Sequence, residues 1–312
     1  MQTLKREEIQ TALNEKKGWQ TWWRLLRPHT LTASFVPVFV GTMLAIQQTS
    51  FHFLLFLAMM TASIVIQAAT NMFNEYYDYV RGLDNENSIG IGGAIVRDGI
   101  QPKTIKHLAI TFFVIAVLLG VYISIETTWW VGLTGAISMI FGYLYTGGPY
   151  PIAYTPFGEL TSGTLMGTVI VAVSFFIQTG YVNAEIFLVS IPVAIFIGSI
   201  LLANNIRDRD GDKIAGRKTI AILLGHKKAI RFLAVLYAVA YGLTFLFIIL
   251  GILPWWSLIG FLSIPKAKEA VQGFVGKSSP LEMLPAMKST SQVNTFYGFL
   301  VGISLFISFL FQ

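Results

Sequence analysis

The chain has 312 residues, of which 54% are hydrophobic and only 12% charged, and its formal net charge is +6. A soluble domain carries about a quarter charged residues, so this composition excludes an ordinary soluble enzyme and indicates an integral membrane protein. The chain contains no cysteine, which excludes disulfides, cysteine-ligated zinc and iron–sulfur clusters. Its four histidines are scattered without ligand spacing, which argues against a haem or di-metal oxidase.

Nine apolar segments are candidates for membrane spans, which need about 17–25 mostly apolar residues. In chain order they cover residues 30–47, 53–72, 107–125, 128–146, 160–179, 185–203, 230–250, 254–265 and 292–311. Pro265 and Lys266 cut the eighth short, so we expect it to be tilted or extended by the amphipathic stretch to Val275. Small residues in SGTLMGT (162–168) favour close helix approach. The sequence predicts an all-α bundle of nine transmembrane helices over residues 30–312.

The basic residues predict how this bundle is oriented. With nine spans and a cytoplasmic N-terminus, all 22 Lys and Arg fall on the cytoplasmic side, as the positive-inside rule requires. The Lys and Arg residues after the first span lie in 73–106, 204–231 and 264–291.

Residues 1–29 are expected to form a separate cytoplasmic segment. Its end, TWWRLLRPH (21–29), mixes tryptophan with arginine as interfacial segments do. No cleavable signal pattern precedes the first span. We therefore expect a multi-pass protein of the cell membrane and no nucleic-acid partner.

A polar cluster, NMFNEYYDYVRGLD (71–84), directly follows the second span. We expect the helix to continue into it, and positions three and four apart share one face of a helix. Asn71, Asn74 and Asp78 then line one stripe, and Glu75 lies beside it. Asp84 follows a glycine, where a loop can fold its carboxylate back toward the same point.

A second cluster, NNIRDRDGD (204–212), follows the sixth span in the same way. Asn204, Asp208 and Asp212 are spaced i, i+4 and i+8, and Asn205 and Asp210 flank them. Four spans separate the two clusters, and Asn and Asp recur in both at the same relative spacing. This pattern suggests two related half-bundles whose acidic ends face each other.

Carboxylates gathered at a membrane surface repel one another unless a cation lies between them. Mg²⁺ takes oxygen ligands and is commonly shared between carboxylates and substrate phosphates, so the clusters predict a Mg²⁺–diphosphate site. Metal ions and nearby cations stabilise the charge that develops when a C–O bond to diphosphate breaks. Candidate cations are Arg81, Arg97, Lys103, Arg207, Arg209, Lys213, Arg217 and Lys218. The alternative is a set of interfacial carboxylates paired with neighbouring basic residues, but polar residues in membrane proteins usually mark function.

The two clusters carry a resemblance to a known family. N-E-x-x-D at 74–78 followed by Asp84, and D-x-x-x-D at 208–212 followed by AGRKTIAILLG (215–225), resemble the two aspartate-rich motifs of the UbiA superfamily of intramembrane prenyltransferases. Glu75 stands where Asp is usual in that family. Within it the chain is similar to the 1,4-dihydroxy-2-naphthoate polyprenyltransferases of menaquinone synthesis. This narrower match is carried by RPHTLTASFVPVFVGT (27–42), IGGAIVRDG (91–99), YLYTGGPYPIAYTPFGEL (143–160) and AMKSTSQVNTFYGFL (286–300).

The resemblance implies a Mg²⁺-dependent enzyme that transfers a polyprenyl group from an allylic polyprenyl diphosphate to 1,4-dihydroxy-2-naphthoate, releasing diphosphate and CO₂. It implies a UbiA-like bundle with a central cavity open to the cytoplasmic side and no obligate protein partner. The implied metal ligands are Asn74, Glu75, Asp78, Asn204, Asp208 and Asp212, and the implied catalytic residues are Asp78, Asp84, Asp208 and Asp212. The candidates for substrate binding are Asn71, Arg81, Arg97, Lys103, Tyr145, Asn205, Lys213, Arg217 and Lys218.

Tyr145 is one of four tyrosines in the Gly- and Pro-rich segment 143–160, together with Tyr143, Tyr150 and Tyr154. They either orient the aromatic acceptor and shield an allylic cation, or form an aromatic belt at the membrane interface.

Two other functions fit parts of the pattern. A different aromatic acceptor, such as 4-hydroxybenzoate, would keep the metal motifs and change the segment 143–160. A secondary transporter also uses carboxylates on discontinuous helices, but near mid-membrane, whereas these clusters lie at the ends of spans.

Overall fold

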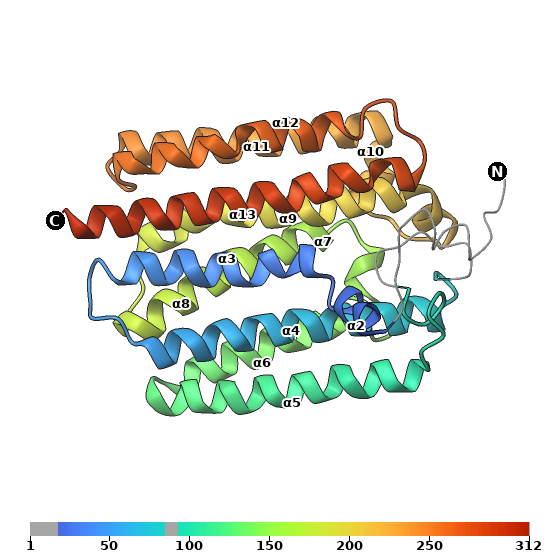
Figure 1. The fold of residues 1–312 in the computed structure, drawn as a ribbon, viewed down its shortest axis with the longest axis horizontal. Helices are drawn as coiled ribbons and strands as arrows, with labels where there is room; N and C mark the ends of the chain where they lie inside the picture. Colours follow the sequence, from blue (N-terminus) through green and yellow to red (C-terminus); the bar gives the residue numbers. More distant parts are fainter. Residues whose placement is uncertain (1–17, 85–92, 312) are drawn as a thin grey trace.

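The computed structural model describes residues 18–84 and 93–311, which form helices and no strand (Figure 1). Its elements are α2 (Trp19–Leu25), α3 (Pro28–Ala45), α4 (Phe53–Val80), α5 (Pro102–Glu126), α6 (Trp129–Leu144), η1 (Ile152–Tyr154), α7 (Gly158–Ser162), η2 (Gly163–Val169), α8 (Ile170–Thr179), α9 (Ala184–Ile214), α10 (Ile220–Leu224), α11 (His226–Ile249), η3 (Trp255–Ser263), α12 (Ile264–Gln272) and α13 (Pro280–Leu310). The all-α prediction is therefore confirmed for the described residues. Most of the interfacial segment predicted at 1–29 lies outside them.

Seven helices among the described residues are long and apolar enough to cross a membrane. They are α3, α4, α5, the continuous helix of α7, η2 and α8, then α9, α11 and α13. The fourth and eighth predicted spans correspond to shorter elements, the apolar helix α6 and the pair η3 and α12. The chain is thus a multi-pass membrane protein, and the count of nine spans stays a prediction.

The eighth predicted segment continues beyond its proline. A 3₁₀-helix, η3, leads directly into α12, which ends at Gln272. Pro265 lies in the first turn of α12, where a helix needs no backbone N–H donor. The predicted extension is therefore helical as far as Gln272, short of Val275, and Pro265 lies in the first turn of this helix.

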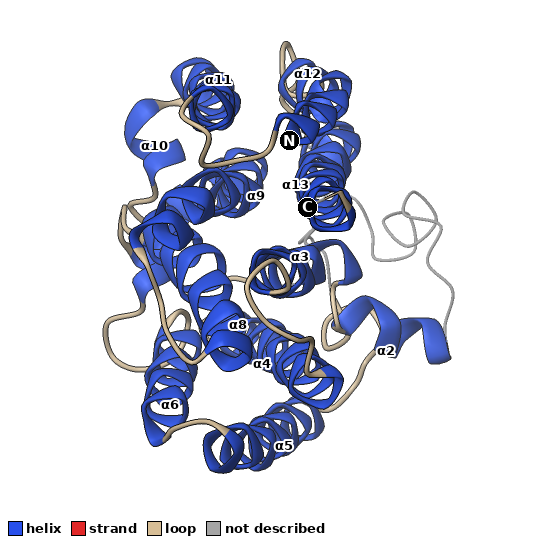
Figure 2. Ribbon diagram, turned by 90° about the vertical axis from the view of Figure 1, so that its left-hand side faces the viewer, coloured by secondary structure: helices blue, strands red, loops and turns tan. Residues whose placement is uncertain are grey.

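The helices lie alongside one another, and α3 runs through the middle of the bundle (Figures 1 and 2). It packs against α4 and α8 on one side and against α13 and α9 on the other. The largest core cluster joins residues of α3, α8, α9, α11 and α13. This packing holds α4 and α9 in one bundle with their C-terminal ends on the same side.

Glycines allow the helix that contains η2, a π-helical turn, to approach α9 closely. A Cβ atom added to Gly163 would lie 2.7 Å from the carbonyl oxygen of Ala194, and one added to Gly167 would collide with the Ala194 backbone. Such small-residue contacts are typical of helix packing in membranes. The close approach predicted from SGTLMGT is confirmed.

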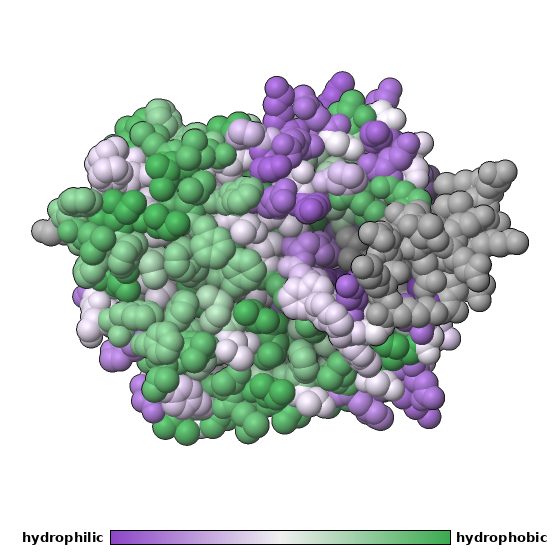
Figure 3. All heavy atoms as spheres, viewed as in Figure 1, coloured by the Kyte–Doolittle hydropathy of each residue, from purple (hydrophilic) through white to green (hydrophobic). Residues whose placement is uncertain are grey.

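The surface of the bundle is divided between apolar and polar parts. In Figure 3 apolar side chains cover most of the left-hand part of the face, and hydrophilic ones gather toward the right-hand end. The C-terminal ends of α4 and α9 lie toward this right-hand end in the same view (Figure 1). Both predicted acidic clusters therefore lie at the polar end of an otherwise apolar bundle.

Candidate functional site

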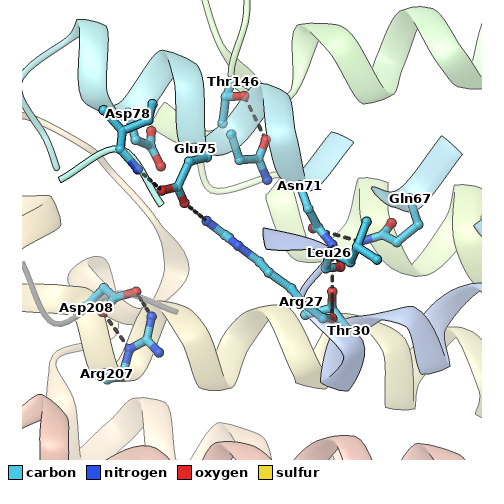
Figure 4. Close-up of polar contacts among 12 residues, drawn as sticks. Leu26, Arg27, Thr30, Gln67, Asn71, Glu75, Asp78, Thr146, Arg207 and Asp208 are labelled. Atoms are coloured by element: carbon cyan, nitrogen blue, oxygen red, sulfur yellow. Dashed lines mark hydrogen bonds and ion pairs between the residues drawn. The ribbon is translucent and has the colours of Figure 1, made fainter. Parts of the chain in front are cut away.

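The first acidic cluster is held in place by partners from distant parts of the chain. α4 continues to Val80, so the cluster is helical as predicted. Asn71 Nδ2 donates to the Leu26 carbonyl oxygen at 2.8 Å and to Thr30 Oγ1 at 3.0 Å, and Asn74 Oδ1 accepts a hydrogen bond from Thr146 Oγ1 at 2.7 Å (Figure 4). These bonds fasten α4 to the start of α3 and to the segment that follows α6.

Glu75 differs from the other predicted metal ligands. Its side chain is 2% exposed, its Oε2 lies 3.6 Å from Arg27 Nη2, and its Oε1 accepts a hydrogen bond from the backbone N–H of Ile95 at 3.4 Å (Figure 4). It lines neither of the two cavities described below. The structure therefore places Glu75 in an ion pair with Arg27, behind the stripe formed by Asn74 and Asp78.

The second acidic cluster carries its own cations. α9 continues as a helix to Ile214, and Arg207 Nε donates to Asp208 Oδ1 at 2.7 Å. Arg209 pairs with the exposed Asp210. Asp212 is 5% exposed, and its Oδ2 has no hydrogen-bond partner among the described residues.

Arg217 joins the two clusters. Its Nη2 lies 2.6 Å from Asp78 Oδ1 and its Nη1 2.9 Å from Asp212 Oδ1. Burial by itself lowers the pKa of Arg217, but the two carboxylates raise that pKa above its ordinary value, so the guanidinium stays charged. The prediction that the acidic ends of α4 and α9 face each other is confirmed by this bridge.

A cavity of about 440 Å³ begins between the clusters and continues among apolar helices. The predicted site residues that line it are Asn71, Asn74, Asp78, Tyr145, Asn204, Asn205, Asp208, Asp212 and Arg217. Its remaining wall includes apolar residues of α4, α5, α6, η2 and α8, such as Met59, Val121, Met139, Leu165 and Val173. The cavity thus has one polar, charged end and a long apolar remainder.

A polar recess of about 60 Å³ adjoins the charged end. Asp84 and Arg97 line it together with residues that also line the main cavity, namely Asp78, Asp208, Arg27 and Arg207. Burial, reinforced by the negative charges of Asp78 and Glu75, raises the pKa of Asp84 to about 7. The fold therefore returns Asp84 to the acidic cluster, as the sequence predicts, and brings Arg97 to it as well.

Five of the predicted cations, Arg81, Lys103, Arg209, Lys213 and Lys218, line neither cavity. Lys103, Lys213 and Lys218 have exposed side chains, because they lie in the solvent-facing loops and helix ends where most basic residues of a membrane protein gather. Arg81 donates to the carbonyl oxygens of Thr146 and Gly148. It therefore anchors the segment after α6, and the structure gives it no contact with either cavity.

Among the four tyrosines of segment 143–160, only Tyr145 lines the main cavity. Tyr143 shares a hydrogen bond with Tyr77 at 2.7 Å, Tyr150 is exposed, and the ring of Tyr154 lies near the guanidinium groups of both Arg81 and Arg217.

Sequence reasoning gave no specific role to three residues of the site. Arg27 and His29 line the cavity from the start of α3, and Glu159 on α7 accepts a hydrogen bond from Asn205 Nδ2 at 2.9 Å. The only feature of the sequence that pointed to Arg27 and His29 was their position at the start of segment 27–42, which resembles the family. Glu159 had no signal beyond its place in segment 143–160.

The carboxylates at the charged end fit a metal that is shared with a phosphate ligand. No three His, Asp or Glu side chains within residues 18–84 and 93–311 are grouped closely enough to hold a metal by themselves. Mg²⁺, however, is usually held by one or two carboxylates together with waters and substrate phosphates. Asp78, Asp208 and Asp212 face one cavity with two amide side chains, Asn74 and Asn204. The unpartnered Asp212 Oδ2 leaves an oxygen ligand available.

The comparisons with known proteins agree with this geometry. The model of the UbiA prenyltransferase family matches residues 34–273. The chain is 55% identical over 309 residues to the 1,4-dihydroxy-2-naphthoate octaprenyltransferase of Bacillus subtilis (strain 168), and the match covers 99% of each chain.

Solved structures share the fold. The apo structure of a UbiA homolog from Aeropyrum pernix K1 matches with a TM-score of 0.67 at 16% identity, over 90% of this chain and 98% of that chain. A UbiA homolog from Archaeoglobus fulgidus bound to DMAPP and Mg²⁺ matches with a TM-score of 0.58 at 19% identity, over 90% of this chain and 98% of that chain.

Proposed function

The chain belongs to the UbiA prenyltransferase family, and we propose that it transfers a polyprenyl group from a polyprenyl diphosphate to 1,4-dihydroxy-2-naphthoate. The products are diphosphate, CO₂ and demethylmenaquinol, which makes the enzyme part of menaquinone synthesis. Identity of 55% over nearly the whole length to a 1,4-dihydroxy-2-naphthoate octaprenyltransferase supports this acceptor. The observation that carries the reaction type is a cavity with a charged end between two acidic helix ends and an apolar remainder.

The shape of the cavity fits a prenyl diphosphate. The charged end suits the diphosphate, and the apolar wall suits a chain of isoprene units, because burying apolar surface is favourable at about 25 cal/mol per Å². We infer that Arg27, Arg97 and Arg207 contact the diphosphate oxygens, since all three line the polar recess beside Asp84. Arginine is well suited to phosphate because its donors form a planar fork.

We propose Mg²⁺ as the cofactor, held by Asn74, Asp78, Asn204, Asp208 and Asp212. Mg²⁺ bound there would neutralise the diphosphate and stabilise the charge that develops on it as the C–O bond breaks. Asp84 supports this set from the recess. Glu75 is assigned a supporting role only, because its carboxylate is engaged by Arg27 and Ile95. The A. fulgidus homolog that holds Mg²⁺ together with DMAPP supports a divalent metal.

The chain's own residues then position the reacting groups. The apolar wall holds the prenyl chain and keeps water from the allylic carbon, and Tyr145 presents its ring and hydroxyl near the charged end. The ring carbon that bears the carboxylate forms the new C–C bond to the allylic carbon, and the C–O bond to diphosphate breaks with its electron pair leaving on diphosphate. The bond to the carboxylate breaks, and its electron pair returns to the ring as CO₂ leaves.

We further propose that the bundle has nine spans, with α6 and the pair η3 and α12 crossing the membrane as shorter elements. The placement of all Lys and Arg on one side favours a cytoplasmic site in the cell membrane. Residues 1–29 are proposed to form a cytoplasmic and interfacial segment, and the exposed side chains of Trp19, Trp22 and Trp23 favour contact with headgroups.

The acceptor is tested with purified protein in detergent. 1,4-Dihydroxy-2-naphthoate and 4-hydroxybenzoate are offered separately with a polyprenyl diphosphate, each with Mg²⁺ or with EDTA. We expect prenylated product from the naphthoate alone and only with Mg²⁺. Product from the benzoate alone would keep the mechanism and refute the acceptor, and no product from either would refute the proposed function.

A further inference from the structure

Glu159 is a buried carboxylate that the proposed reaction has not used. It lies on α7, within a span, and is 6% exposed. None of the Arg, Lys or His residues described by the structure forms an ion pair with it. A buried charge without a cation costs free energy, and ionisable residues within spans usually mark function.

The position of Glu159 is fixed by close helix packing. A Cβ atom added to Gly198 on α9 would lie 2.9 Å from the Glu159 carbonyl oxygen, so the two backbones nearly touch there. This contact holds the Glu159 side chain opposite Asn205, which lies seven residues, about two turns, after Gly198 on α9. Glu159 Oε1 accepts a hydrogen bond from Asn205 Nδ2 at 2.9 Å, while its Oε2 is buried without a hydrogen-bond partner in the described part of the chain.

This hydrogen bond fixes the orientation of the Asn205 side-chain amide. Asn205 Nδ2 is the donor to Glu159, so the Oδ1 atom of the same amide is directed to the opposite side. Oδ1 is not one of the enclosed oxygens that lack a partner, and Asn205 lines the main cavity. The amide therefore offers a hydrogen-bond acceptor to a ligand there.

The cavity that Asn205 lines also carries hydroxyl groups that suit a phenol. Tyr145 and Thr161 also line this cavity, and a Cβ atom added to Gly158 would lie 3.6 Å from the Tyr145 hydroxyl, which places that hydroxyl close to α7. Asn205 lies three residues before Asp208 and seven before Asp212 on α9, so it shares a helix face with both and lies near the charged end of the cavity.

The proposed acceptor has one hydroxyl that needs such a partner. In 1,4-dihydroxy-2-naphthoate the 1-hydroxyl lies beside the carboxylate and donates to it within the molecule, whereas the 4-hydroxyl has no internal acceptor. We propose that Glu159 is a positioning residue that orients the Asn205 amide so that Oδ1 accepts a hydrogen bond from the 4-hydroxyl. This inference rests on the proposed function and adds how the acceptor is recognised.

The test compares two ligands that differ only in that hydroxyl. Dissociation constants of 1,4-dihydroxy-2-naphthoate and 1-hydroxy-2-naphthoate are measured on the purified protein under reducing conditions. Wild type is expected to bind the dihydroxy compound roughly tenfold more tightly, the typical effect of one hydrogen bond. Glu159→Gln, whose amide no longer dictates the orientation of Asn205, should reduce this preference to roughly twofold by weakening only the dihydroxy ligand. The KM for polyprenyl diphosphate should not change.

Three further variants separate positioning from a structural role. Asn205→Ala should lose the preference entirely, and Glu159→Gln combined with Asn205→Ala should match Asn205→Ala alone, because residues that act as a unit are not additive. Glu159→Asp retains a carboxylate acceptor and should keep most of the preference. Glu269→Gln, which removes an exposed glutamate paired with Lys266, is the control and should behave as wild type.

Two results would overturn this inference. One is an unchanged preference in Glu159→Gln; the other is equal weakening of both ligands, which would indicate a structural role. The thermal midpoint in detergent checks folding of each variant, and if Glu159→Gln does not fold, the preference in Asn205→Ala decides the outcome. A wild-type protein that gives no product from the naphthoate would refute the proposed function itself, and product formation with an unchanged preference would refute the inference alone.

Discussion

The ends of α4 and α9 carry similar acidic patterns but are built in different ways. The α4 end depends on distant partners, since Asn71 is held by Leu26 and Thr30, Asn74 by Thr146, and Glu75 by Arg27. The α9 end is paired with cations from its own stretch of chain, as Asp208 is with Arg207 and Asp212 with Arg217.

This difference indicates that the two helix ends have different structural roles. The α4 end is fixed by distant parts of the fold, whereas the α9 end and the loop after it supply positive charge along with carboxylates. Arg217 is the link, because it contacts Asp78 on α4 and Asp212 on α9. A divalent metal and a diphosphate placed between the two ends would therefore replace an existing cation bridge.

The largest effect should come from removing one carboxylate from either end. Asp78→Ala and Asp212→Ala are each expected to lower turnover by roughly a thousandfold or more, because each deletes a ligand from the shared charged end of the cavity. Prenyl transfer by purified protein measures this, and retention in the membrane fraction checks insertion. Normal turnover in either variant would refute the idea that both ends serve one site.

The next largest effect concerns the bridge. Arg217→Gln leaves two buried carboxylates facing each other, so the thermal midpoint in EDTA should fall by roughly 5 °C or more. Mg²⁺ should restore most of that loss, because it supplies the missing positive charge. Arg209→Gln, at an exposed ion pair, serves as the matched control and should change the midpoint little. A loss in Arg217→Gln that Mg²⁺ does not reduce would mean that the bridge has only a structural role.

Glu75 should tolerate change better than Asp78, although both lie in the first motif. Glu75→Asp is expected to keep turnover within roughly tenfold of wild type, since the side chain pairs with Arg27 and lines neither cavity. Its dependence on Mg²⁺ concentration should match that of wild type. If Glu75→Asp needs far more Mg²⁺ for half-maximal rate, Glu75 is a direct ligand.

The smallest expected effect is on the pH dependence of Mg²⁺ affinity. The pKa of Asp84 is raised to about 7 in the metal-free protein, so below that pH Mg²⁺ has to displace a proton. Mg²⁺ affinity should therefore increase from pH 6 to pH 8 and then level off. Asp84→Asn removes this proton and should make the pH profile of Mg²⁺ affinity shallower, as measured by calorimetry without diphosphate. An unchanged slope in Asp84→Asn would assign the proton to another group.

Hydropathy and local spacing predict the parts of the molecule that depend on local sequence. The apolar segments are found where helices form, and the spacing of Asn71, Asn74 and Asp78 predicts that α4 continues past its apolar part, as it does to Val80. The spacing of Asp208 and Asp212 does the same for α9. These features depend on helix periodicity, which a sequence displays directly.

The partners of these residues depend on tertiary packing, which local sequence does not display. Thr146 lies 72 residues from Asn74, and Glu159 lies 46 residues from Asn205. The sequence around Asn74 or Asn205 therefore does not predict these contacts. The basic residues illustrate the same limit. Lys213 and Arg217 both follow the second motif, yet Lys213 is exposed in the last turn of α9, whereas Arg217 lies in the loop after that helix and bridges the two ends.

The most direct test of the central claim, that the two helix ends jointly hold one metal–diphosphate group, is a binding measurement. Mn²⁺ replaces Mg²⁺, and its bound fraction is measured by electron paramagnetic resonance with an unreactive polyprenyl thiolodiphosphate. Wild type, Asp78→Ala and Asp212→Ala are compared with and without this analogue. We expect the analogue to increase Mn²⁺ binding in wild type and to lose that effect in both variants. If either variant binds Mn²⁺ and the analogue as wild type does, the two ends do not form one site.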